Sequence, residues 1–209
     1  KAEEVSKGKE VEAPNAPKHI FPISGGLGQR QIAHIGVQGD YIRTPWFNIP
    51  IVFSHYDLKL RDFPHNDAMV INCNIGGYIV HNVLLDNGSA ADILTATAFV
   101  KMGLDNNNFQ PSTNPLCGFG GKKVDTLGKI PLSITFGTGQ NSRTEDTTFD
   151  VVEIDYPYNT ILGRPTLNAF EAVLHPTYLV MKIPSTYQAI TIFGSQEDAR
   201  KAEGTWGCQ

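Results

Sequence analysis

Charged residues are scarce in this chain of 209 residues: Asp, Glu, Lys and Arg together make up 18% of it, against 41% hydrophobic residues. A chain with so many apolar side chains can bury a core, which excludes global disorder. No run approaches the roughly 18 consecutive apolar residues that cross a bilayer, so we expect no membrane contact. The length fits one domain with extensions.

Basic residues and cysteines are also few. A formal net charge of -4 leaves no excess of Lys and Arg for a nucleic-acid-binding face, and we expect none in this segment. The three cysteines, Cys73, Cys117 and Cys208, are far apart and match neither a zinc site nor a disulfide framework. The six histidines form no metal-binding spacing. We therefore expect a reducing compartment, the cytoplasm, and no metal or other cofactor.

The composition divides the chain into four parts. Residues 1–20 lack apolar periodicity and are expected to be a disordered lead-in, and residues 21–62 to be an irregular extension or a spacer. Residues 63–195 carry the strand patterns of a folded domain, and residues 196–209 are left as a C-terminal tail. Because the chain begins at Lys1 rather than Met, we expect it to be a piece of a longer polyprotein.

Short strands dominate the domain. Apolar and polar residues alternate over residues 69–75, Gly76 and Gly77 suit a two-residue hairpin turn, and residues 78–85 run back as a second strand. Residues 91–102 favour a helical turn or two, and Pro165 favours the start of a short helix ending at Phe170. The pattern predicts an all-β domain, closed or sandwiched. Further strand candidates are residues 130–136, 148–154, 179–183 and 189–193.

One acidic residue stands out by its position. Asp86 follows three large apolar residues and precedes Asn87, Gly88 and Ser89. A carboxylate at the end of an apolar strand is partly desolvated, and a glycine two residues on lets the backbone turn tightly beneath it. Taken alone this is also the pattern of a simple turn. The segments around it favour acid/base chemistry.

Four pieces of the chain, in order, resemble the retropepsins, the retroviral-type aspartic proteases. The resemblance covers roughly residues 64–200 and is greatest to the proteases of gypsy-class retrotransposon gag-pol polyproteins in plants. It implies a retropepsin-like closed β-barrel, the acid protease fold, with one short C-terminal helix and an N-terminal extension. The four pieces are the glycine hairpin at residues 70–78, the loop at 84–89, the glycine cluster at 118–121 and the Ile-Leu-Gly-Arg sequence at 161–164.

The resemblance implies an endopeptidase in which two aspartates share one proton and activate a water molecule. The chain has one convincing catalytic loop, because the segment Asp125 to Gly128 has an extra residue and no apolar strand before it. The second carboxylate would come from Asp86 of another copy, so we expect a homodimer that cleaves its own gag-pol polyprotein, in the cytoplasm or in virus-like particles. A mobile flap over the bound polypeptide would be formed by Gly118, Phe119, Gly120 and Gly121.

The resemblance also assigns supporting roles and marks a departure. Gly163 and Arg164 would tie the C-terminal helix to the catalytic loop, and Asp92 is the carboxylate we expect to pair with Arg164. Asn87 stands where the family usually has Thr or Ser, whose hydroxyl locks the two loops of the dimer. An amide can both donate and accept, so it could rebuild that link or loosen it. The alternative function is therefore a catalytically degenerate dimer that serves as a binding or assembly module.

Overall fold

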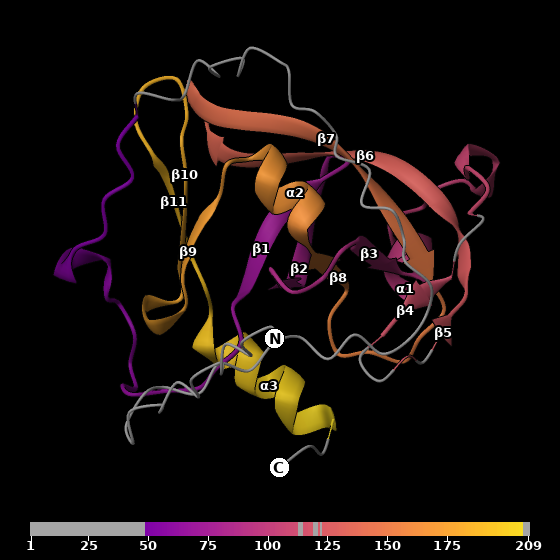
Figure 1. Cartoon of the computed structure of the whole chain (residues 1–209), viewed down its shortest axis with the longest axis horizontal. Helices are drawn as coiled ribbons and strands as arrows, with labels where there is room; N and C mark the ends of the chain where they lie inside the picture. The colour runs from indigo at the N-terminus through magenta and orange to yellow at the C-terminus, as the bar shows by residue number, and fades with distance from the viewer. Residues whose placement is uncertain (1–48, 113–114, 119–120, 122, 207–209) are drawn as a thin grey trace, which may run out of the picture. The chain divides into compact units, whose positions relative to one another are not determined.

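The computed structural model describes residues 49–112, 115–118, 121 and 123–206, so the expected lead-in and most of the expected extension lie outside it. The predicted all-β class with a closed barrel is confirmed (Figure 1). The strands are β1 (Val70–Ile75), β2 (Tyr78–Leu85), β3 (Asp92–Thr95), β4 (Leu116–Cys117), β5 (Lys123–Val124), β6 (Thr126–Thr138), β7 (Asn141–Val152), β8 (Thr160–Leu162), β9 (Val173–His175), β10 (Val180–Ile183) and β11 (Ile190–Phe193). The helices are α1 (Ala96–Lys101), α2 (Arg164–Ala169) and α3 (Gln196–Trp206), with short 3-10 turns at His55–Asp57, Asn106–Asn108 and Pro176–Tyr178.

The barrel closes in the order β1, β2, β8, β3, β7, β6, and β6 returns to β1 through the pairs Asn74 with Thr135 and Ile75 with Ile134. Its interior is filled by large apolar side chains, such as those of Ile75, Ile134 and Phe149, each fully buried. β2 runs parallel to β8 and β3 runs parallel to β7. These parallel pairs set the C-terminal end of β2 beside β8, and the loop that carries Asp86 leaves from that end.

The hairpin between β1 and β2 was predicted correctly. Gly76 and Gly77 both have positive φ angles, +58° and +86°, and Ile75 pairs with Tyr78 across them. A two-residue turn of this hand matches the right-handed twist of the strands and requires residues that tolerate positive φ. The side chains of Ile71, Cys73 and Ile75 point into the core, as their alternation with polar residues indicated.

The prediction of helical turns from residue 91 was wrong at its start. Asp92–Thr95 forms strand β3, which lies between β8 and β7, and helix α1 begins only at Ala96. Thr95 ends the strand and caps the helix, because its hydroxyl oxygen accepts a hydrogen bond from the Ala98 N–H at 3.2 Å. The early residues are strand because the gap between β7 and β8 supplies backbone partners on both sides.

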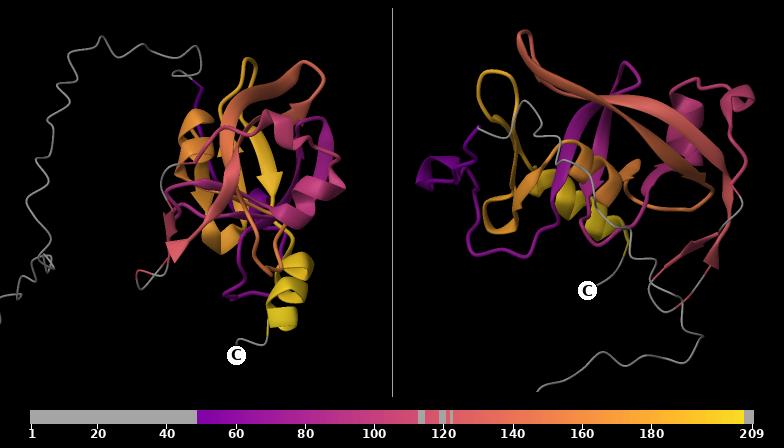
Figure 2. Two further views of the ribbon diagram at one scale, coloured as in Figure 1. Left: turned by 90° about the vertical axis from the view of Figure 1, so that its right-hand side faces the viewer. Right: turned by 45° about the horizontal axis from the view of Figure 1, so that its top comes forward.

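A buried arginine joins the barrel to helix α2 and sheet β9–β11. Arg143 lies on β7, which pairs along its length with β6 as a long twisted ribbon (Figure 2). Its guanidinium donates to the carbonyls of Ala169 at 2.7 Å and Phe170 at 3.0 Å, where α2 ends, and to that of Pro184 at 3.2 Å. Its side chain is only 5% exposed, and Glu145 accepts a hydrogen bond from its Nε at 2.8 Å. One side chain therefore satisfies carbonyls from two separate elements.

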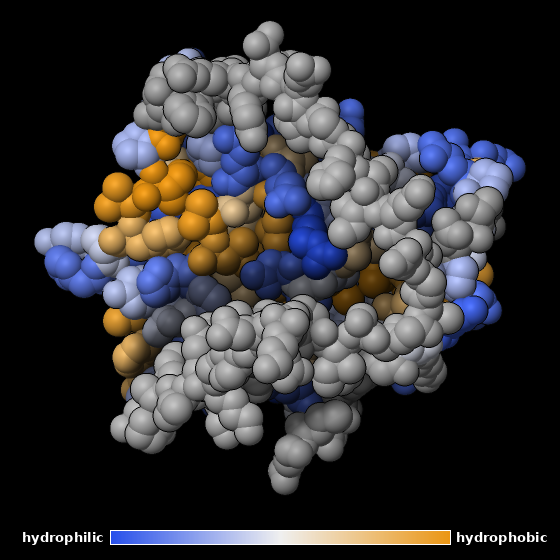
Figure 3. Space-filling model, in the orientation of Figure 1, coloured by the Kyte–Doolittle hydropathy of each residue, from blue (hydrophilic) through white to orange (hydrophobic). Residues whose placement is uncertain are grey.

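The segment before the barrel packs beside the sheet β11–β10–β9. The ammonium of Lys182 on β10 pairs with Asp57 at 2.7 Å and donates to the carbonyl of Val52 at 2.7 Å. The ring of Phe53 lies against that of His175, with centroids 5.2 Å apart. Apolar side chains gather on the surface where this sheet lies (Figure 3). Part of the expected extension or spacer is thus in contact with the domain.

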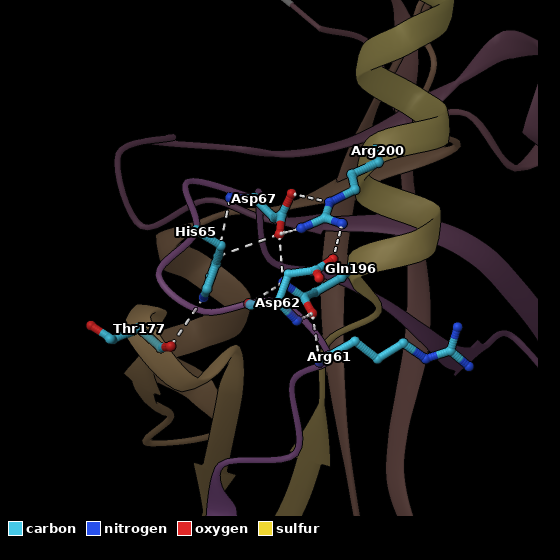
Figure 4. Close-up of polar contacts among 7 residues, drawn as sticks. All are labelled: Arg61, Asp62, His65, Asp67, Thr177, Gln196 and Arg200. Atoms are coloured by element: carbon cyan, nitrogen blue, oxygen red, sulfur yellow. Dashed lines mark hydrogen bonds and ion pairs between the residues drawn. The ribbon is translucent and has the colours of Figure 1, made fainter.

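Residues 196–206 form helix α3. The sequence had indicated only a C-terminal tail there. Ala199 and Ala202 of α3 pack on Val70 and Tyr158, outside the barrel core. Polar contacts hold the other side of the helix to the chain before β1 (Figure 4). Arg200 bonds to Asp62 and Asp67, and Gln196 accepts hydrogen bonds from the N–H groups of Arg61 and Asp62.

The same network includes a histidine. The Nδ1 of His65 accepts from the Asp67 N–H at 3.1 Å, and its Nε2 lies 3.0 Å from the Thr177 carbonyl. Figure 4 shows this ring between the segment before β1 and the turn before β10.

In the part of the chain that the structure describes, every helix is too short or too polar to span a bilayer.

Replacing the buried guanidinium should be costly. Arg143→Met keeps an unbranched apolar stem but leaves three carbonyls, two of them in buried hydrogen bonds, and Glu145 without their donor. We expect the free energy of unfolding to fall by about 3 to 5 kcal/mol, the usual result of removing one partner of a buried charged network. Urea unfolding followed by circular dichroism measures it. The control is Arg200→Met, whose guanidinium is 45% exposed and should cost clearly less. Equal losses in the two variants would contradict this account of Arg143.

Candidate active site

The loop after β2 is a tight turn built around Asp86. The Asp86 N–H donates to the Leu162 carbonyl of β8 at 3.0 Å, so the loop begins fixed to the barrel. The Gly88 N–H donates to Oδ1 of Asp86 at 2.9 Å, and the Ser89 N–H donates to the Asp86 carbonyl at 3.2 Å. A Cβ at position 88 would lie 3.1 Å from that same carboxylate oxygen, so glycine leaves Asp86 room. The half-buried carboxylate is thereby oriented by its own turn.

The junction between β8 and α2 holds the loop from the other side. The Arg164 N–H donates to the Ser89 carbonyl at 3.0 Å, and its guanidinium donates to the Gly88 carbonyl at 2.9 Å. Gly163 passes so close to the loop that a Cβ there would lie 2.3 Å from the Ala91 carbonyl oxygen. Only glycine permits that approach. The loop and the junction are therefore interlocked by backbone groups.

Asp92 follows the loop directly and is 1% exposed. Its Oδ1 accepts from the Gly163 N–H at 2.7 Å, and its Oδ2 accepts from the Thr147 hydroxyl at 2.7 Å. Burial raises the pKa of the Asp92 carboxyl group, and hydrogen bonds from Thr147, Gly163 and Thr166 partly offset that rise. The expected ion pair between Asp92 and Arg164 is not formed, because Arg164 reaches the Gly88 carbonyl instead.

The loop faces a cleft of about 610 Å³. Its opposite wall is the β4–β5 hairpin, in which Leu116 pairs with Val124. Of the four residues expected to form a flap, Gly118 and Gly121 join in a turn through a 3.0 Å hydrogen bond, and Phe119 and Gly120 lie outside the described residues. The described residues that line the cleft are Asp86, Gly88, Ser89, Ala90, Ala91, Ile93, Leu116, Cys117, Gly118, Val124, Val152 and Ile154.

The cleft is apolar apart from the loop itself, and Asp86 is the one charged side chain among the described residues that line it. Asn87 is exposed beside it and makes no hydrogen bond through its side chain to other described residues. No three His, Cys, Asp or Glu side chains converge on a metal position within the described ranges. The arrangement offers one carboxylate, set in an apolar groove open to solvent.

Two neighbours of the site were not singled out by the sequence. Thr147 lies 55 positions from Asp92, and no local pattern marks it as a partner. Tyr156 lies close enough to Asp86 to interact with its charge. Burial raises the pKa of Tyr156 most, and the negative charge of Asp86 raises it further.

Neither a protein-family model nor a curated protein matches the chain. Similar solved structures exist. The retroviral protease-like domain of Ddi1 from Leishmania major is 16% identical, with a TM-score of 0.44 over 63% of this chain and 96% of that one. A retropepsin-like aspartic protease from Rickettsia conorii is 20% identical, with a TM-score of 0.41 over 58% of this chain and 83% of that one.

The close contact between Gly163 and the loop gives a testable prediction. Gly163→Ala places a methyl group against the Ala91 and Ser89 carbonyls, and either the loop or the junction must move. We expect the free energy of unfolding to fall by about 1 to 3 kcal/mol, the range for overpacked sites. A matched substitution is Gly204→Ala in α3, where no atom lies within 4 Å of the added Cβ. That change should stabilise the helix by up to about 1 kcal/mol. Thermal or urea unfolding of both variants tests the pair, and a neutral Gly163→Ala would refute the close approach.

Proposed function

We propose that this protein is an aspartic endopeptidase of the retropepsin type that works as a homodimer. The observation that carries the proposal is Asp86, a lone half-buried carboxylate beside an apolar cleft, on a loop fixed from beneath by β8 and α2. An extended polypeptide fits a groove whose far wall is a β-hairpin, because strand edges bind peptides through backbone hydrogen bonds.

Two carboxylates supply the chemistry. The Asp86 side chains of the two subunits share one proton, because like charges about 3 Å apart cannot both ionise. The ionised carboxylate takes a proton from a water molecule, and the water oxygen attacks the scissile carbonyl carbon. The protonated carboxyl group gives its proton to the carbonyl oxygen. The carboxyl group that took the water proton then gives it to the amide nitrogen, the other carboxylate takes a proton from a hydroxyl of the tetrahedral intermediate, and the C–N bond breaks. The pair titrates as a unit.

The requirement for a second subunit follows from the composition of the cleft. Among the described residues that line it, no carboxylate other than Asp86 is present. The Asp86 side chain takes one backbone hydrogen bond from Gly88 and has no cation paired with it in the described part of the chain. A two-fold axis beside the loop brings a second Asp86 to the first.

We also propose a particular substrate and origin for the protease. Four motifs in order support a protease from the gag-pol polyprotein of a gypsy-class retrotransposon of a plant. The substrate would be that polyprotein, cleaved in the cytoplasm or in virus-like particles. No cofactor is needed, because water is the nucleophile.

Peptide cleavage tests the role of Asp86. Purified protein is assayed on a mixed peptide library at about pH 5, between the usual carboxyl pKa values and neutrality. Asp86→Asn is isosteric but cannot act as a base, and we expect it to lose at least about a thousandfold in kcat/KM. The control is Asp125→Asn, which alters the aspartate of the segment Asp125 to Gly128, where an extra residue separates Asp from Gly, and should retain activity. Cleavage by Asp86→Asn at the wild-type rate would end the proposal.

Mixing the two proteins tests whether the site is shared. If subunits exchange and both Asp86 residues are needed, a threefold excess of Asp86→Asn should lower the rate of a fixed amount of wild type to about one quarter, the share expected for random pairing. Serum albumin at the same excess should leave the rate unchanged. A rate that is unaffected by Asp86→Asn, while gel filtration shows mixed dimers, would mean that one chain holds the whole site.

A second candidate is a dimer without turnover that acts as a binding or assembly module, and Asn87 is the residue that favours it. Asn87→Thr restores the hydroxyl that the family usually has at this position. Cleavage that appears only in Asn87→Thr, from dimers as stable as wild type, would favour the module. Cleavage by wild type within about tenfold of Asn87→Thr would favour the enzyme.

A further inference from the structure

Asp92 is a buried carboxyl group that the cleavage mechanism does not use. It begins β3, six residues after Asp86, and lies beneath the catalytic loop rather than in the cleft. It contacts the start of helix α2, whose N-cap residue is Gly163 and has no side chain to accept a hydrogen bond. The acceptor that a helix start requires therefore comes from another element.

Asp92 connects three elements through this cap. Gly163 precedes the first turn of α2 and donates its N–H to the carboxyl group, and Thr166 lies within that turn, close enough to lower the pKa of the carboxyl group. Thr147 donates to the other oxygen from β7. Arg164, in the same first turn, donates its N–H to Ser89 and its guanidinium to Gly88. A shift of α2 away from Asp92 would therefore move the loop that carries Asp86.

No cation balances Asp92 among the described residues. On α2, Arg164 bonds to the Gly88 carbonyl. On β7, Arg143 bonds to carbonyls and Glu145, Asp146 is exposed, and Asp150 pairs with Lys129. β8 has no charged residue, Asp86 lies on the loop itself, and Lys101 is exposed at the far end of α1. Only dipoles face the carboxyl group.

We propose that Asp92 is a positioning residue, and that it holds the catalytic loop against helix α2 most tightly when its carboxyl group carries a proton. The neutral group keeps the same atoms in contact with the Thr147 bond reversed: its O–H donates to the Thr147 hydroxyl, which donates to Oδ2 of the ionised group, and Oδ1 still accepts from Gly163. The ionised group leaves a charge buried without a cation, which favours opening of the loop to water. The loop is therefore most rigid in acid, where the proposed protease works. The statement about cleavage rests on the proposed function, and the statement about the loop does not.

The direction of the shift in the Asp92 pKa determines how closure of the loop depends on pH. Burial raises the pKa of Asp92 in the closed loop above that of an open, solvated loop. The closed state then binds the proton more tightly, so closure is favoured below the pKa of the open state. That gain is lost as pH rises through the raised pKa of the closed state.

Hydrogen exchange tests the loop without requiring activity. Full-length protein is exchanged at pH 5 and pH 7.5, and peptides covering residues 86–92 and 163–167 are corrected for the intrinsic effect of pH. We expect protection in wild type to be about threefold or more higher at pH 5. Asp92→Asn mimics the neutral group, so its protection should change by less than about 1.5-fold between the two pH values. Thr147→Val removes the acceptor for the proton and should reduce the gain in acid.

The matched control is Asp150→Asn, a second buried aspartate on the neighbouring strand that pairs with Lys129 and does not contact the loop. It should keep the threefold response of wild type. The proposal is overturned if Asp92→Asn responds to pH as wild type does, or if wild-type protection is lower at pH 5. It is also overturned if all peptides of the barrel change together, because the loop would then not be the element that responds.

Cleavage gives a separate readout. If wild type cleaves peptides, Asp92→Asn should retain a larger fraction of its pH 5 kcat at pH 7 than wild type does, with KM within about twofold. Equal loss of kcat in the two proteins would overturn a positioning role for Asp92. If no protein cleaves at any pH while the exchange results are as expected, the proposed function fails and the inference about the loop stands.

Discussion

The close approach of Gly163 to the loop after β2 is the constraint on which the site depends. The loop and residues 162–164 exchange backbone hydrogen bonds with no side chain between them. A methyl group added at Gly163 would lie 2.3 Å from the Ala91 carbonyl oxygen. Backbone contacts of this kind do not change with rotamer, so they fix the loop more firmly than side-chain contacts could. The loop, β8 and the first turn of α2 consequently behave as one unit. The position of Asp86 is set by the barrel together with the turn of its own loop.

That rigidity determines what the site can do. A single carboxylate held at a fixed point in an apolar groove is a poor acid and base by itself, since catalysis of amide hydrolysis needs both a proton donor and an acceptor. In the homodimer that we propose, a symmetric copy would supply the missing half, because it would bring an identical group held in the same way. The apolar walls formed by Ile93, Val124 and Val152 also limit the water around the carboxylate.

Local patterns predicted what local physics determines. The Gly76 and Gly77 turn, the alternating strand after Met69 and the tight turn at Asp86 are encoded within a few residues, and each is where the sequence indicated. α3 was missed although Ser195, whose hydroxyl accepts from the Asp198 N–H, is a good N-cap and acidic residues follow it. The signal was present but lacked a clear apolar stripe, because two alanines are the buried residues of the helix.

Other features could not be read from the sequence because the partners are distant or carry no side-chain signature. The partners of Asp92 include a backbone N–H 71 positions away, which any residue but proline could offer. Arginine at position 164 looked like the natural partner for a buried aspartate, and only the packed structure directs it to a carbonyl. The strand β3 depended in the same way on β7 and β8, which supply its hydrogen bonds.

The contacts of Arg200 with Asp62 and Asp67 have a consequence for the order of folding. They join residues more than 130 positions apart, at opposite ends of the part of the chain that the structure describes. Contacts between such distant residues must bear the entropy of closing a long loop, and they form late. During synthesis from the N-terminus, Asp67 leaves the ribosome long before α3 exists. A nascent chain would therefore complete the barrel first and gain its closing contacts only when the last helix emerges.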